Sequence, residues 1–213
     1  RSTDNGSSFS TVTSPTSNEL RGVGFGNNTF VAVGTSGTIV RSTDNGSSFD
    51  NVTSPTSTTL WGVTFGNNTF VGVGESGTIV RSTDNGSYFH NVTSPTANSL
   101  YDVGFGNYTF VGVGTSGTIV RSTENGASFS TVTSPTSTTL WGVGFGNYTF
   151  VGVGNSGTIV RSTDNGSSFD NVTSPTSTTL WGVTFGNNIF VGVGNSGTIV
   201  RSTDNGSSFD NVT

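Results

Sequence analysis

The sequence contains no cysteine, no methionine and no lysine, and His90 is its single histidine. Without cysteine, the chain has neither disulfide bonds nor a thiol nucleophile. With a single imidazole, the chain cannot build a metal site from several histidines, and it cannot build more than one Ser-His-Asp relay. We expect His90 to lie exposed on an outer strand. Methionine is missing even at position 1, which indicates a chain that was processed or cut from a longer parent.

Charge is also scarce, because only 9% of the residues are charged and the formal net charge is −5. Six of the seven arginines occupy one repeat position, so there is no basic patch to hold a phosphate backbone, and nucleic acid is not an expected partner. No apolar run approaches the length that spans a bilayer. A surface rich in Ser, Thr and Asn without lysine favours an extracellular or cell-surface location.

What the chain does contain is one motif repeated every 40 residues, with no insertion or deletion. The stretch RSTDNGSSF at residues 41–49 represents it, and its copies begin at Arg1, Arg41, Arg81, Arg121, Arg161 and Arg201. Each period carries several short apolar runs separated by Gly and Asn. A repeat of this length is one supersecondary unit that is stable only when it stacks on its neighbours.

One period predicts four antiparallel strands. Residues 54–59 are expected to form a loop, and the strands are expected at 60–65, 69–73, 78–82 and 87–92, with turns at 66–68, 74–77 and 83–86. Four antiparallel strands in 40 residues make one blade of a β-propeller, so we predict an all-β fold.

The kernel of the repeat, Ser-x-Asp-x-Gly-x-x-Phe, predicts a stapled hairpin corner. Asn45-Gly46 is a turn dipeptide because both residues tolerate positive φ. The Asp44 carboxylate can accept hydrogen bonds from the N–H groups that follow it, Ser42 can add its hydroxyl, and Phe49 returns to the core.

This kernel resembles the Asp-box, or BNR repeat, of sialidases and many other β-propellers. The six copies are Ser2, Asp4, Gly6 and Phe9; Ser42, Asp44, Gly46 and Phe49; Ser82, Asp84, Gly86 and Phe89; Ser122, Glu124, Gly126 and Phe129; Ser162, Asp164, Gly166 and Phe169; and Ser202, Asp204, Gly206 and Phe209. The chain departs from the family pattern in using Phe instead of the commoner Trp and in placing Glu124 in the fourth copy. The resemblance implies a structural role for the box, at a blade corner away from the ligand face.

The resemblance does not extend to sialidase chemistry, which needs three clustered arginines, a tyrosine activated by a glutamate, and an acid. Arg21 is the only arginine outside the box flank, and Glu19, Glu75 and Glu124 lie in three different repeats. No spacing argues that Glu75 and Asp102 meet as a hydrolytic pair, and one carboxylate per turn is too few for a calcium site. We therefore expect no enzyme, no cofactor and no metal.

The copies divide the chain into one domain of five blades, at about residues 14–53, 54–93, 94–133, 134–173 and 174–213. Glycines such as Gly62 and Gly72 inside the inner strands indicate close backbone approach and favour a tight ring of five. Residues 1–13 are then an additional outer-strand segment that overhangs, exchanges with the last blade, or pairs with another chain. The alternative is a segment of a larger ring, completed by a partner chain or by a parent sequence.

Differences between the copies predict the ligand site. The residue that enters the first strand is flat in every blade: Arg21, Trp61, Tyr101, Trp141 and Trp181. In propellers this end of the blade lies opposite the Asp-box corner, together with the turns that carry Glu75, Asn155 and Asn195. These groups and Asp102 could bind sugar rings, the aromatic planes by stacking and the polar groups by hydrogen bonds. The alternative is that the aromatic side chains wedge between blades as core.

Two functions follow from these sequence features. The first is a non-enzymatic, lectin-like binding module for a carbohydrate or a cell-surface protein at the mouth of the channel. The second is an engineered or recently amplified repeat protein with no selected ligand, since the copies are nearly identical. A third function, glycoside hydrolysis, is kept only because the fold resembles that of such enzymes.

Overall fold

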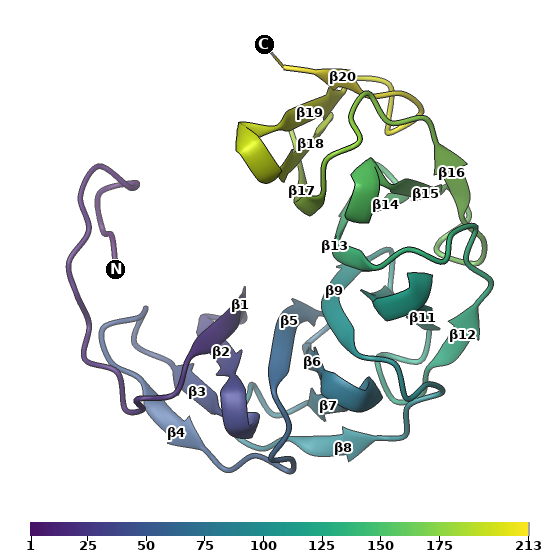
Figure 1. Ribbon diagram of the computed structural model, residues 1–213. Coiled ribbons are helices and arrows are strands. Elements are labelled where there is room, and N and C mark those ends of the chain that lie inside the picture. The colour runs from purple at the N-terminus through teal and green to yellow at the C-terminus, as the bar shows by residue number, and fades with distance from the viewer. Residues whose placement is uncertain (213) are drawn as a thin grey trace.

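The computed structural model describes residues 1–212, and it consists of five separate antiparallel sheets of four strands each. In every sheet the strands follow one another in chain order, so each is a simple meander built from one repeat. Figure 1 shows the five sheets arranged side by side around an axis, like blades. The predicted all-β propeller with five four-stranded blades is confirmed. No helix in residues 1–212 is long and apolar enough to cross a membrane.

The blades are numbered 1 to 5 along the chain. Blade 1 contains β1 (Leu20–Gly26), β2 (Thr29–Gly34), β3 (Ile39–Ser42) and β4 (Asp50–Val52). Blade 2 contains β5 (Leu60–Gly66), β6 (Thr69–Gly74), β7 (Ile79–Ser82) and β8 (His90–Val92). Blade 3 contains β9 (Leu100–Gly106), β10 (Thr109–Gly114), β11 (Ile119–Ser122) and β12 (Ser130–Val132). Blade 4 contains β13 (Leu140–Gly146), β14 (Thr149–Gly154), β15 (Ile159–Ser162) and β16 (Asp170–Val172). Blade 5 contains β17 (Leu180–Gly186), β18 (Ile189–Gly194), β19 (Ile199–Ser202) and β20 (Asp210–Asn211).

The strands agree with the sequence prediction except at two places in each blade. The turn expected at 74–77 is a short 3-10 turn, η2 (Glu75–Gly77), and its equivalents are η1 (Thr35–Gly37), η3 (Thr115–Gly117), η4 (Asn155–Gly157) and η5 (Asn195–Gly197). The fourth strand is shorter than the expected 87–92 and spans only His90–Val92, with His90 exposed at its start. It is shorter because the box turn continues to residue 88, where the Tyr88 N–H still bonds to the Asp84 carboxylate.

The hydrophobic core lies between successive blades. Alternate residues of β2 and β3, including Val33 and Ile39, face blade 2, where they meet Leu60, Phe70 and Phe89. The same arrangement recurs between blades 2 and 3, 3 and 4, and 4 and 5. Because side chains alternate across a strand, each inner blade buries one face against the preceding blade and the other against the next. A single blade therefore has no core of its own.

Glycines let the innermost strands approach one another. A Cβ atom on Gly142 in β13 would lie 2.9 Å from the Trp181 carbonyl oxygen and 2.9 Å from Gly182 Cα in β17. Those are backbone atoms that cannot rotate away, so a side chain at position 142 would require β13 and β17 to move apart. The inner-strand glycines favour a closed ring of five blades. The structure shows the predicted close approach of the backbones, but the five blades do not close into a ring.

The five blades form an arc whose two ends do not meet. Figure 1 shows β1 and β17 on opposite sides of the opening. Nothing lies within 4 Å of the Cβ position of Gly182 or of Gly186 in blade 5. Of the two arrangements open from the sequence, the arc of a larger ring describes this structure better than a closed ring of five. Four interblade cores form, and no fifth core joins blade 5 to blade 1 in the described residues.

Residues 1–13 form no regular strand. The Arg1 amino group donates to the Ser10 carbonyl oxygen at 2.7 Å, and the Ser10 N–H donates to the Arg1 carbonyl oxygen at 2.9 Å. This repeats the pairing of Arg41 with Asp50 in blade 1. In blade 1 the same ladder continues through Val40 and Ile39, and these two residues have no counterpart before Arg1.

The two equivalent glycines in β13 and β17 give a matched test of interblade contact. We expect Gly142→Ala to lower the free energy of unfolding by about 1–3 kcal/mol, because its Cβ overlaps backbone of the next blade. Gly182→Ala meets no atom and is expected to be neutral or stabilising by up to about 1 kcal/mol through reduced chain entropy. Urea unfolding of both variants measures the difference, and equal effects would contradict the close packing described above.

Candidate functional site

The box turn is held by a network of short-range hydrogen bonds. Ser42 Oγ donates to Asp44 Oδ1 at 2.8 Å and accepts from the Gly46 N–H at 2.9 Å. Asp44 Oδ1 also accepts from the Ser48 N–H at 3.0 Å, while Asn45 and Gly46 have φ values of 59° and 75°. Hydrogen bonds from the backbone and hydroxyl of Ser48, and from Ser42, lower the pKa of Asp44. The predicted stapled corner is confirmed in this geometry.

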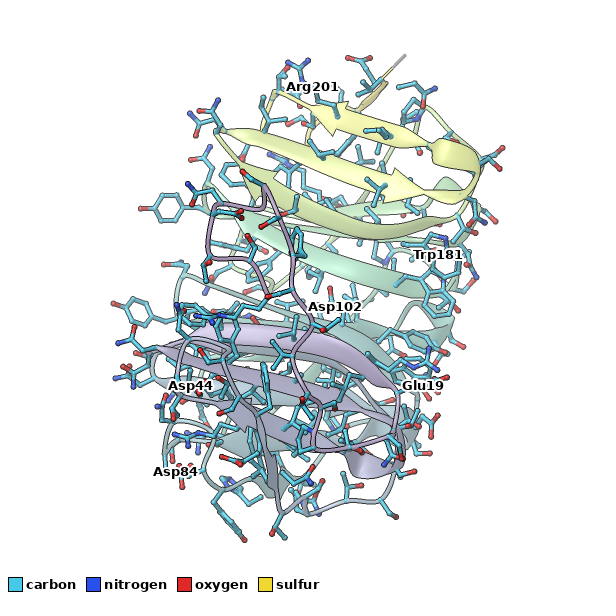
Figure 2. The ribbon with its side chains drawn as sticks, turned by 90° about the vertical axis from the view of Figure 1, so that its left-hand side faces the viewer. Glu19, Asp44, Asp84, Asp102, Trp181 and Arg201 are labelled. Carbon is cyan, nitrogen blue, oxygen red and sulfur yellow. The ribbon has the colours of Figure 1, made fainter. Side chains whose placement is uncertain are left out.

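The carboxylates of the box aspartates therefore serve the turn. In the last copy, hydrogen bonds from the Ser208 hydroxyl, the Ser208 N–H and the Ser202 hydroxyl lower the pKa of Asp204 to about 2. Figure 2 shows Asp44 and Asp84 at one face of the arc, with Glu19 and Trp181 at the opposite face. The box thus lies away from the expected ligand face.

Glu124 makes a weaker network in the fourth copy. Its longer side chain places Oε2 2.8 Å from Ser128 Oγ. Within residues 1–212, no hydrogen bond joins this carboxylate to Ser122 Oγ or to a backbone N–H, although both bonds form in the Asp44 copy. One extra methylene moves the carboxylate out of reach of those donors.

The arginine that precedes each box links neighbouring blades. Arg41 Nε donates to the Asn85 carbonyl oxygen in the box turn of blade 2 at 2.7 Å. Arg81, Arg121 and Arg161 make the same bond to the following blade at 2.8 Å. The repeated arginine thus joins each of the first four blades to the box turn of the next blade by a hydrogen bond. This bond is the polar counterpart of the hydrophobic interblade core.

The five flat side chains predicted as a ligand site do gather at one rim. They line a hollow of about 340 Å³ on the inner side of the arc: Arg21, Trp61, Tyr101, Trp141 and Trp181. We call this group the aromatic crescent. The Arg21 guanidinium lies 4.9 Å from the Trp61 ring centre, and Arg21 also pairs with Glu19. Trp181, at the end of the crescent, is 48% exposed.

The rings of the crescent pack against one another in edge-on or tilted arrangements. Ring centres are 5.7 Å apart for Trp61 and Tyr101, 4.2 Å for Tyr101 and Trp141, and 4.9 Å for Trp141 and Trp181. These are favourable aromatic separations, so each inner ring packs between two others. Tyr101 and Trp141 are half-buried, whereas Trp181 at the end of the crescent keeps a free face.

Of the polar residues predicted at the mouth of the channel, Asn155 and Asn195 bond to rings of the crescent, and within the described part of the chain Glu75 does not. Asn155 Oδ1 and Asn195 Oδ1 accept from the indole N–H groups of Trp141 at 2.7 Å and Trp181 at 2.6 Å. These asparagines orient the rings. Glu75 occupies the equivalent position in blade 2, but the Trp61 Nε1 group is buried without a hydrogen-bond partner. The structure therefore does not join Glu75 to the crescent.

Asp102 is deeper than the sequence suggested. It is half-buried between the two faces in Figure 2. Its Oδ1 accepts from the Val103 N–H at 2.8 Å, and its Oδ2 accepts from the Val143 N–H at 2.9 Å in the next blade. Burial raises the pKa of the Asp102 carboxyl, although both hydrogen bonds oppose this effect. The sequence signal for this interblade role was an acid where the other blades have Gly22, Gly62, Gly142 and Gly182.

The rim presents groups that are suited to contact with a ligand. Residues 1–212 contain no group of three or more Asp, Glu or His side chains placed to hold a metal ion. The crescent offers aromatic surface, one guanidinium and amide groups, which recognise a ligand by stacking and hydrogen bonding.

Comparison with known proteins identifies the fold and no family. No protein-family model and no curated protein sequence matches the chain. The structure is similar to YCF48 bound to D1 peptide, with a TM-score of 0.71 and 17% identity over 92% of this chain and 67% of that one. It is also similar to YCF48 from Cyanidioschyzon merolae, with a TM-score of 0.69 and 16% identity over 95% and 74% of the two chains. The YCF48 structures are β-propellers, so this likeness shows the fold alone.

The computationally designed Ika8 protein is similar to the same extent. Its TM-score is 0.70 and its identity is 16%, over 91% of this chain and 60% of that one. This chain is thus shorter than each of the three proteins on which it superposes.

The fourth box gives a test of the hydrogen-bond network. Glu124→Asp restores the side chain found in the other five copies, and we expect it to raise the free energy of unfolding by about 1 kcal/mol by recovering bonds to Ser122 Oγ and a backbone N–H. The matched control, Asp164→Glu, should lower stability by a similar amount. Chemical denaturation measures both, and a stabilising Asp164→Glu would contradict the network.

The raised pKa of Asp102 predicts a pH-dependent effect of Asp102→Asn. A carboxyl whose pKa is higher in the folded chain stabilises the fold below its unfolded pKa, and this contribution is lost as pH rises through the folded pKa. The parent should therefore lose stability relative to Asp102→Asn as the pH rises above about 4, by about 1.4 kcal/mol for each unit of pKa elevation. Unfolding of both chains across this range provides the measurement, and a constant difference would contradict the prediction.

Proposed function

We propose that this chain is a non-enzymatic binding module whose contact surface is the aromatic crescent. The observation that carries the proposal is the convergence of one planar side chain from each of the five blades on one hollow. It lies opposite the box turns, which we interpret as Asp-boxes with a structural role. A ligand there would touch several blades at once, so weak contacts would add.

Carbohydrate is the ligand class that this surface fits best. Trp181 presents an exposed ring face beside the Asn195 amide, and Arg21 places a cation at the other end of the crescent. The apolar face of a sugar stacks on indole, while its hydroxyl groups bond to amide and guanidinium groups. A protein segment is the second candidate class, and the likeness to YCF48 bound to D1 peptide supports it. We also propose an extracellular or cell-surface location, on composition.

The alternative is a repeat scaffold without a selected ligand. The near-identity of the repeats favours it, as does the packing of the inner rings against one another. The Ika8 protein, which has a similar structure, was computationally designed and is a precedent for such a scaffold. Under this alternative the crescent contributes to stability alone.

Glycan-array binding, repeated with Trp181→Ala, separates the two functions. We expect the substitution to weaken binding about tenfold or more, as for a truncated aromatic hot spot, because the exposed ring is the surface on which a sugar would stack. The matched control is Tyr148→Ala, since Tyr148 is exposed but lies beside the box turn of blade 5, whose Asn205 bonds to Thr149.

Thermal unfolding of both variants checks that they remain folded. Binding that is equal in Trp181→Ala and in the parent would exclude the crescent as the site. Absence of binding to glycans and to a peptide array by the parent would favour the scaffold.

A further inference from the structure

The exposed side of blade 5 is an unoccupied interblade surface. Val193 is 48% exposed and Ile199 is 41% exposed, whereas their equivalents Val73 and Ile79 in blade 2 are 0% and 1% exposed. In the inner blades these positions pack against Leu and Phe of the next blade. Blade 5 therefore presents half of an interface that the chain forms four times elsewhere.

The exposed side of blade 1 is the other half of the same interface. Val23 is 65% exposed, against 8% for its equivalent Val63. Leu20 is exposed and Phe30 is partly exposed, whereas Leu60 and Phe70 are fully buried against the preceding blade. The two ends of the arc are thus complementary in their apolar groups.

The polar interblade contact is also missing at both ends. Four arginines donate to the box turn of the following blade, but Arg201 in blade 5 has no blade after it and is exposed. At the other end, the box turn of blade 1 at Asn45 lacks the arginine of a complete preceding blade. Arg201 is thus a donor without an acceptor in a following blade, and within residues 1–212 the Asn45 carbonyl oxygen accepts no such bond, although Arg1 holds the equivalent arginine position beside it.

Residues 1–13 lie where the outer part of a preceding blade would be. A Cβ on Gly46 would lie 4.0 Å from Arg1 Cδ, and the equivalent distance from Gly86 to Arg41 Cδ is 3.5 Å. At Gly86 the nearest atom is Val31 Cγ2, from the second strand of the preceding blade, and no such valine is present near Gly46. The third-strand end and box of a blade are therefore in place, without its inner strands.

Two hollows mark the place of the missing strands. One of about 330 Å³ is lined by Arg1, Val12, Phe30 and Phe49 together with parts of two box turns. The other, of about 150 Å³, lies between the segment that contains Val12 and Pro15 and the face that contains Leu20 and Val40. Both are walled by side chains that inner-strand valines cover in the other blades.

We propose that further blades of this same 40-residue repeat fill the opening, and that the blade beside residues 1–13 contributes only its three inner strands. The partner is thus defined by its chemistry. It offers Leu and Phe to Val193 and Ile199, a box turn to Arg201, and second-strand valines to Phe30 and Gly46. Residues 1–13 supply the outer strand of its last blade.

A second copy of the chain fits this opening less well. Blade 5 already has its own third-strand end, box turn and β20. If blade 5 of one copy packed on blade 1 of another, its residues 201–211 would compete with residues 1–10 of that copy for one position. An occupant that ends after its third strand meets no such conflict.

The experiment appends inner strands to the full chain. After residue 213, the extended chains carry zero, one, two or three complete repeats, copied from residues 174–213, and then the three inner strands copied from residues 174–200. At the length that closes the ring, we expect a monomer whose unfolding midpoint rises by about 10 °C or more, since both apolar faces become buried. Deletion of residues 1–13 from that chain should abolish most of the rise.

A matched substitution reports the new contact directly. Gly182→Ala is harmless while nothing faces Gly182, and it should lower the midpoint in the closed chain, as Gly142→Ala does in the parent. The proposal is overturned if no length raises the midpoint, if no extended chain is a soluble monomer, if deletion of residues 1–13 has no effect, or if the parent closes by dimerising, as its mass in solution would show. None of these readouts uses ligand binding, so the result is independent of the function proposed for the crescent.

Discussion

Packing of one sheet on the next is the constraint that governs every other feature of the molecule. Each blade alternates large apolar side chains between its two faces, and neither face can be shielded within a single repeat. The free energy of folding of one blade therefore depends on its contacts with the neighbouring blades, as in other repeat proteins. The hydrogen bond from Arg41 to the Asn85 carbonyl oxygen, repeated at three further interfaces, fixes the register of this packing, because it joins a strand of one blade to a single point in the next.

The box turn contributes to the same interface in a second way. Its Ser and Asp side chains satisfy the turn internally, which leaves the Asn carbonyl oxygen pointing outward as the acceptor for the preceding arginine. The Asn85 side chain also donates to Thr29 Oγ1 of the preceding blade. The motif is therefore a rigid connector as well as a corner. This explains why it is nearly invariant among the copies while the rim of the blades varies.

The rim shows how a uniform repeat acquires local differences. Where Gly62 and Gly142 allow close backbone approach, Asp102 instead bridges two blades through the Val103 and Val143 N–H groups. Where Trp141 and Trp181 are oriented by asparagine, Trp61 is covered by Arg21 and lacks a partner for its indole N–H. The two ends of the crescent thus differ in charge and exposure, although the blades that carry them share one backbone.

The amino-acid pattern alone was enough to predict what repeats locally: the four strands of each blade, the hairpin stapled by Ser42 and Asp44, and the gathering of five flat side chains at one rim. The strands and the hairpin follow from the spacing of apolar residues and from turn chemistry, which act within one repeat. The gathering at one rim follows from the constant period of 40 together with the general arrangement of propeller blades. The folded chain was needed to show that the five blades leave an opening, that the crescent rings pack against each other, and that Asp102 lies between blades. These features depend on the angle between neighbouring sheets, which is the sum of many side-chain contacts and has no signature in the period. The inner glycines illustrate the difference, because they show that backbones approach closely without specifying how many blades complete the circle.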